Sequence, residues 1–213
     1  MYDNQTAKEI INHMKYIKSK DIKLYNILIN KLKNEGDITL LILKNDTKQL
    51  EERLNLKIKN IERNNKNQVK FMKDIRSKMD MEKNIYLNKF YEYLHSGILA
   101  KNNIESEVIN ENNCNDYKIT VSSDIKTKNE NIEIQAQLNI KDVIKVKKYK
   151  LDKLSKSNTS LIVFNKTNYY SYYKLKNTKT MNLSNLEVRQ DLSFGGKEYY
   201  LIPLSYFDYV EYL

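Results

Sequence analysis

The sequence predicts an α+β protein, in which a long helical N-terminal half is followed by a mixed β-sheet domain with flanking helices. Two observations carry this prediction. Residues 1–100 repeat apolar side chains at helical spacing, whereas residues 115–213 place β-branched and aromatic residues in short runs, which is typical of strands. This change in composition predicts a helical region over residues 1–95 and an α/β domain over residues 96–213.

Amphipathic helices are expected over the first 33 residues. Apolar side chains recur there at steps of three and four, as on one face of a helix. Ile10 and Ile17 belong to the first series, and Leu24 and Leu28 belong to the second. Gly36 then predicts a helix end.

Residues 46–95 contain neither proline nor glycine, and they predict a coiled-coil-like helix. Apolar residues follow alternating steps of four and three, with polar interruptions such as Asn65. A helix of about fifty residues spans roughly 75 Å and is not stable alone in water. Two alternatives stay open. The helix pairs with a second copy and forms a homodimer, or it folds back on residues 5–33.

The C-terminal part predicts a sheet. Residues 132–140 alternate strictly between apolar and polar side chains, which indicates a strand with one buried face. Residues 160–164 form a continuous apolar run, as expected of a central strand. A short helix is expected within residues 146–157, a strand over residues 169–175, and a hairpin over residues 192–204.

The charge balance favours a polyanionic partner, with DNA first. The chain carries 37 Lys and Arg against 27 Asp and Glu, a formal net charge of +10. Neutralising phosphates with such side chains releases counterions, which drives binding. The alternative is that these charges form an ordinary solvated surface.

Other classes of protein are disfavoured. No apolar run approaches the roughly 20 residues of a membrane-spanning helix, and the N-terminus lacks a signal-peptide pattern. Cys114 is the only cysteine, so it can form neither an internal disulfide nor a cysteine zinc site alone. We therefore expect a soluble, cytoplasmic protein without a membrane partner.

Two acidic residues are candidates for a metal site. Asp124 and Glu133 lie nine positions apart, so a hairpin can bring their carboxylates to one face of the sheet. Two such carboxylates can hold Mg²⁺ and leave positions open for water and a phosphate oxygen. Gln135 points the same way as Glu133, because side chains alternate along a strand.

This arrangement resembles the core of the PD-(D/E)xK nucleases, which include restriction endonucleases and archaeal Holliday-junction resolvases. The match lies in residues 123–125 and 132–135, and the resemblance extends over residues 98–175. It implies that Asp124 and Glu133 bind Mg²⁺ and that Gln135 positions the attacking water.

The chain departs from the family pattern in two places. Gln135 stands where most members have lysine, and Ser123 replaces the proline before the acid. An alternative alignment uses Gln135 and Gln137, again without lysine. A further acid is expected from Glu105 or Glu107, on the preceding helix.

Four lysines after the acidic strand are the best local candidates for phosphate contacts. They are Lys145, Lys147, Lys148 and Lys150. The sequence thus predicts a metal-dependent, homodimeric DNA endonuclease. The alternative is a non-catalytic nucleic-acid-binding or coiled-coil assembly protein.

Overall fold

The computed structural model describes residues 5–34, 78–109, 123–175, 178, 181–191 and 197–213. These residues fall into two compact units, one of helices and one of strands, which are treated separately below. No helix within those ranges is both long and apolar enough to cross a membrane.

The helical unit contains α1 (Gln5–Lys20), α2 (Ile22–Asn34) and α5 (Lys78–Lys101). Asp21 separates the first two helices. Its Oδ1 accepts the backbone N–H of Leu24 at 2.8 Å, and Oδ2 forms an ion pair with Lys101 at the end of α5. A carboxylate before a helix satisfies one of the helix's unpaired N–H groups, so Asp21 starts α2.

The predicted fold class is wrong in its N-terminal half, because no long coiled-coil-like helix is found among the described residues 5–34 and 78–109. The three helices described here have 16, 13 and 24 residues, and they pack on one another within one chain. Their apolar faces are used in this packing, as the complete burial of Ile17, Leu28 and Leu94 indicates. Residues 46–77, which make up most of the predicted helix over residues 46–95, lie outside the described ranges. The homodimer expected from that helix stays a prediction.

Gly97 lies within α5 and does not end the helix. A Cβ atom at this position would lie 3.3 Å from Cδ1 of Leu24 and 3.8 Å from Cγ2 of Ile27. Glycine is thus explained by the close approach of α5 to α2 rather than by a turn.

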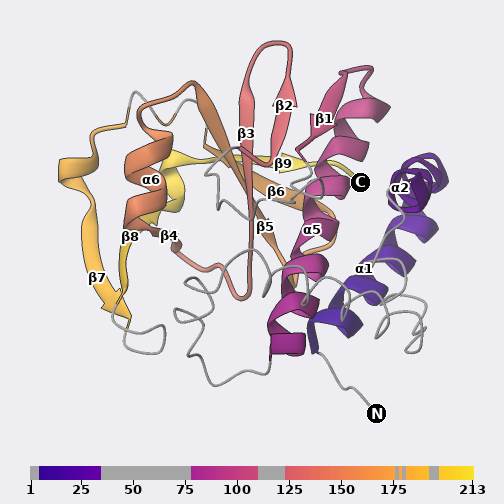
Figure 1. Ribbon diagram of the computed structural model, residues 1–213, viewed down its shortest axis with the longest axis horizontal. Coiled ribbons are helices and arrows are strands. Elements are labelled where there is room, and N and C mark those ends of the chain that lie inside the picture. The colour runs from indigo at the N-terminus through magenta and orange to yellow at the C-terminus, as the bar shows by residue number, and fades with distance from the viewer. Residues whose placement is uncertain (1–4, 35–77, 110–122, 176–177, 179–180, 192–196) are drawn as a thin grey trace, which may run out of the picture. The chain divides into compact units, whose positions relative to one another are not determined.

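The second unit is built on a six-stranded mixed sheet (Figure 1). Its strand order is β1-β2-β3-β5-β6-β9. The bounds are Ser106–Val108 for β1, Ile125–Thr127 for β2, Asn131–Gln137 for β3, Thr159–Asn165 for β5, Ser171–Leu175 for β6 and Asp208–Glu211 for β9. β3 and β5 run parallel, whereas β2–β3, β5–β6 and β6–β9 are antiparallel pairs.

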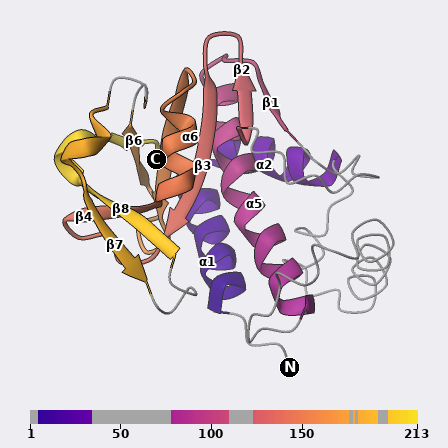
Figure 2. The ribbon, with the colours of Figure 1, turned by 60° about the vertical axis from the view of Figure 1, so that its left-hand side comes forward.

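A second, three-stranded antiparallel sheet has the order β4-β8-β7. Its strands are β4 (Val143–Lys147), β7 (Glu187–Asp191) and β8 (Lys197–Pro203). β4 and the helix α6 (Lys148–Leu154) belong to the connection between the parallel strands β3 and β5. The small sheet and α6 cover one face of the large sheet (Figure 2).

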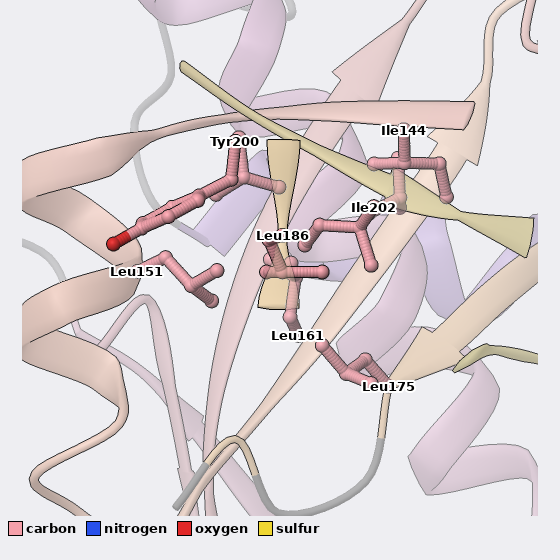
Figure 3. Packing of buried hydrophobic residues seen from close by; sticks show 9 residues of the cluster. Ile144, Leu151, Leu161, Leu175, Leu186, Tyr200 and Ile202 are labelled. Carbon is pink, nitrogen blue, oxygen red and sulfur yellow. The ribbon is translucent and has the colours of Figure 1, made fainter. Parts of the chain in front are cut away.

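The core of this unit lies between the two sheets (Figure 3). Leu161 of β5 and Leu175 of β6 face Ile202 of β8, and Leu151 of α6 packs into the same cluster. β5 is central and almost wholly buried, as its apolar run predicts. Glu133 is paired with Leu161 in the β3–β5 register, so it lies at the border of this core.

Substitution of Gly97 tests the close approach of α5 and α2. We expect Gly97→Leu to lower stability by about 1–3 kcal/mol, because the added side chain meets the buried Leu24. Gly97→Ala should be nearly neutral, since a gain of about 1 kcal/mol in helix propensity offsets one tight contact. Chemical denaturation followed by circular dichroism measures both. Equal stability of the leucine variant and the wild type would contradict this packing.

Candidate active site

The β2–β3 hairpin brings Asp124 and Glu133 together. Ile125 is paired with Ile132, so continuing this register by one residue sets Asp124 opposite Glu133. Opposed residues of an antiparallel pair point to the same face. Oδ2 of Asp124 also accepts the backbone N–H of Ile134 at 2.7 Å, which fixes its carboxylate against β3.

The turn of this hairpin is set by Thr127. Its backbone N–H donates to the carbonyl oxygen of Glu130 at 3.0 Å, and its Oγ1 accepts the N–H of Glu130 at 3.0 Å. Lys128 and Asn129 are then a two-residue loop, which fixes the register of the strands. The turn thereby determines that the two carboxylates meet.

Glu133 is a carboxylate buried at the border of the core. Its side chain is 5% exposed, and its Oε1 forms an ion pair with Nζ of Lys150 on α6. A buried charge of this kind needs a partner, because transfer of an isolated ion out of water is costly. Lys150 thus holds α6 against the acidic pair.

Burial of the side chain is the largest influence on the pKa of Glu133, and the charge of the neighbouring Asp124 carboxylate acts in the same direction. Together they raise the pKa of Glu133 to about 8, although the charge of Lys150 acts in the opposite direction. Burial alone would lower the pKa of Lys150, but Glu133 and Asp124 raise it overall. Near neutral pH the raised pKa of Glu133 therefore favours its protonated form, beside the ammonium group of Lys150.

Gln135 has a different role from the predicted one. Its Nε2 donates to the carbonyl oxygen of Lys145 at 2.8 Å, so this donor is used inside the protein. Gln137 makes a double contact with the same residue, with Nε2 donating to the Lys145 oxygen at 2.6 Å and Oε1 accepting its N–H at 3.3 Å. Because β4 is an edge strand, these two amides satisfy its outer edge and tie the small sheet to β3.

The four candidate lysines separate into different environments. Lys148 forms an ion pair with Glu198 at 3.1 Å, and Lys150 is paired with Glu133. Lys145 is exposed on β4. Burial lowers the pKa of Lys147, and the nearby ammonium groups of Lys197 and Lys150 lower it further.

The contact between Lys150 and Glu133 was not foreseen. Lys150 was predicted only as a phosphate contact, yet a signal was present in the sequence. It precedes the buried Leu151 and lies four residues before the buried Leu154, which places it beside the apolar face of α6. Periodicity alone therefore indicated that Lys150 turns inward.

The acids proposed as a third ligand lie elsewhere. Glu107 is on β1 rather than on a helix, and Glu105 precedes that strand, with both side chains exposed. Within the described ranges, no cluster of three or more His, Cys, Asp or Glu residues suited to a metal ion is found. The oxygen donors at the site are thus the carboxylates of Asp124 and Glu133.

Comparison of the chain with protein-family models, with curated proteins and with solved structures finds no match. The resemblance to PD-(D/E)xK nucleases therefore stays a prediction. What can be argued about function comes from the geometry of the site.

The pKa of Glu133 predicts an unusual pH dependence of stability. Its folded value of about 8 exceeds the reference value of 4.5, so its contribution to stability is full below 4.5 and is lost as the pH rises through 8. Each pKa unit corresponds to about 1.4 kcal/mol, so the loss is on the order of a few kcal/mol. Glu133→Gln removes the titration, and we expect its melting temperature relative to wild type to rise between pH 5 and pH 9.

Glu198→Gln is the matched control, because it removes a carboxylate that is 46% exposed and paired with Lys148. We expect its difference from wild type to be similar at both pH values. If both variants show the same pH dependence of melting temperature, ionisation of the buried Glu133 destabilises the fold no more than ionisation of the exposed Glu198 does, which would contradict the prediction.

Proposed function

We propose that the chain is a metal-dependent nuclease that hydrolyses phosphodiester bonds, with DNA as the first candidate substrate and the cytoplasm as its place of action. The observation that carries this proposal is the meeting of Asp124, Glu133 and Lys150 at one point on β2, β3 and α6. Two carboxylates can hold a divalent cation, and an ammonium group can stabilise the charge that develops on a phosphate.

The donor set fits a hard divalent cation. Mg²⁺ prefers oxygen ligands, and it is commonly bound by one or two carboxylates together with waters and substrate phosphates. The repulsion between Asp124 and Glu133 supports the same reading, since a cation would relieve it. When bound, such an ion supplies Lewis-acid polarisation and a more acidic water.

The chain's own residues have distinct roles in this proposal. Asp124 is held by the N–H of Ile134, so it is oriented before substrate binds. Lys150 is the cation that the resemblance expects at the position of Gln135, and it reaches the site from α6 instead of β3. Its ammonium group can stabilise the charge that develops on the phosphate. Gln135 acts as a positioning residue through its bond to β4.

The reaction is balanced as a hydrolysis. Water attacks phosphorus, one phosphorus–oxygen ester bond breaks, and the leaving oxygen takes up a proton to become a hydroxyl group. The products are a phosphate monoester and an alcohol, and no oxidant or co-reactant is needed.

The topology of the sheet supports the proposal independently of the residues. Asp124 immediately precedes β2, Glu133 lies on the antiparallel β3, and the chain then passes through α6 to the parallel strand β5. The passage from β3 through α6 to β5 agrees with the order that the resemblance implies, except that Asp124 precedes its strand and that β4 comes between β3 and α6. Fold alone does not define function, so the cleavage experiment below is the deciding test.

Cleavage of labelled single-stranded and duplex DNA in Mg²⁺ or Mn²⁺ tests the proposal. We expect Asp124→Asn and Glu133→Gln each to lower the rate by about 10²–10³-fold or more, because each removes a charged ligand. Lys150→Ala should lower it by about 10²-fold, with partial recovery in Lys150→Arg. Lys153→Ala, which removes an exposed lysine from the same helix, should cleave like wild type.

A non-catalytic nucleic-acid-binding protein is the second candidate. It is favoured by the engagement of Gln135 with Lys145 and by a site with only two acidic side chains. Salt-sensitive DNA binding without cleavage in either metal would support this candidate and overturn the nuclease proposal.

Metal binding can be tested without a substrate. At pH 8.5, Mg²⁺ at 100 times its dissociation constant should stabilise the wild type by about 2.7 kcal/mol, which thermal unfolding detects. The effect should be smaller at pH 6.5, because the metal must displace the proton of Glu133. Asp124→Asn should abolish it, and sodium chloride of equal ionic strength is the control. Equal stabilisation of wild type and variant would show that the cation binds elsewhere.

A further inference from the structure

A hollow lies along β3, the strand that carries Glu133. It encloses about 730 Å³, and its walls include Gln135, Gln137, Lys141, Lys145, Lys147 and Tyr199. We call it the lysine hollow. Asp142 is the acidic residue among those that line it, so its charge is predominantly positive.

The hollow continues the face of β3 that carries the site. Glu133, Gln135 and Gln137 alternate along one face of this strand. The lining of the hollow on β3 begins at Gln135, two positions or about 7 Å along the strand from Glu133, and continues through Gln137. A strand of nucleic acid whose phosphate lies at Glu133 would therefore enter it.

Several positive charges lie close to one another at the wall of the hollow. Lys147 lies near the ammonium groups of Lys197 and Lys150, as the lowering of its pKa by both indicates. Like charges gathered on a concave wall attract polyanions, because the low-dielectric walls focus the field. Lys148, by contrast, is paired with Glu198 and does not line the hollow.

The floor of the hollow is fixed. Gln135 and Gln137 both bond to the backbone of Lys145, so the position of the lysines on β4 is coupled to β3 and to Glu133. Such preorganisation lowers the entropic cost of binding. The two glutamines are thus positioning residues for the lysines.

The size of the hollow limits its occupant. A volume of about 730 Å³ is that of a small-molecule site. It admits a nucleotide or two of a single strand but not a duplex.

We propose that the lysine hollow binds the sugar–phosphate backbone of one or two unpaired nucleotides that flank the reacting phosphate. This inference rests on the proposed nuclease function for the location of that phosphate. It adds that the protein prefers a single strand, or an unpaired end, over a blunt duplex.

Binding measured without cleavage tests this proposal. The wild-type chain in EDTA is titrated into a fluorescent 12-nucleotide single strand and into the blunt duplex of the same sequence, over a range of salt concentrations. We expect tighter binding of the single strand. Lys145→Ala and Lys147→Gln should each weaken it several-fold and reduce the slope of log affinity against log salt by about 0.7.

Gln137→Ala tests the floor of the hollow. It changes no charge but removes two of the three side-chain contacts that hold the backbone of Lys145 to β3, so we expect weaker binding with an unchanged salt slope. In a cleavage assay it should raise KM and leave kcat nearly unchanged. Lys153→Ala is the matched control for the lysine variants, and melting curves confirm that each variant is folded.

The outcomes separate this inference from the nuclease proposal. If the wild type cleaves DNA but the lysine variants of the hollow bind it as tightly as Lys153→Ala does, the proposed role of the hollow is overturned and the nuclease proposal stands. The lysine variants are Lys145→Ala and Lys147→Gln. Binding that depends on these lysines, without cleavage in any metal, overturns the nuclease alone. Equal affinity for the single strand and the blunt duplex overturns the preference for unpaired nucleotides.

Discussion

The burial of the Glu133 carboxyl group at the edge of the core between two sheets is the constraint on which the site depends. A carboxylate in this position is tolerated because Lys150 reaches it from α6. The neighbouring Asp124 makes its ionisation more costly still. The protein thus maintains an electrostatically unfavourable pair at one point of a well-packed unit, and such a perturbed group is typical of a candidate functional site.

Three parts of the fold hold the carboxyl groups of Asp124 and Glu133 in place. The β2–β3 turn sets the carboxylates opposite each other, α6 supplies the ammonium group, and two glutamine amides connect β3 to the edge of β4. Gln135 and Gln137 therefore link the two sheets at the point where apolar packing gives way to solvent. A polar residue on a strand face need not contact solvent or substrate, since it can satisfy the edge of another sheet.

The strands and the acidic pair were predictable, whereas the helical half was only partly so. Strict alternation and a continuous apolar run indicated the strands around Glu133 and Leu161, because local periodicity reflects the burial of each face. The same reasoning predicted a long helix wrongly, since an apolar stripe does not reveal whether its partner is another chain or the same one. The contact between Lys150 and Glu133 joins residues 17 positions apart, and the Gln135 contact depends on a second sheet. Local periodicity places Lys150 beside the apolar face of α6, but it identifies neither Glu133 as the partner of Lys150 nor Lys145 as the partner of Gln135.

The pairing of β4 with β8 has a consequence for synthesis of the chain. Lys147 is paired with Tyr199, which is 52 positions later in the sequence, so β4 can pair with β8 only after that later segment has been synthesised. Until then β4 lacks its partner strand, and its lysines are not yet fixed in place.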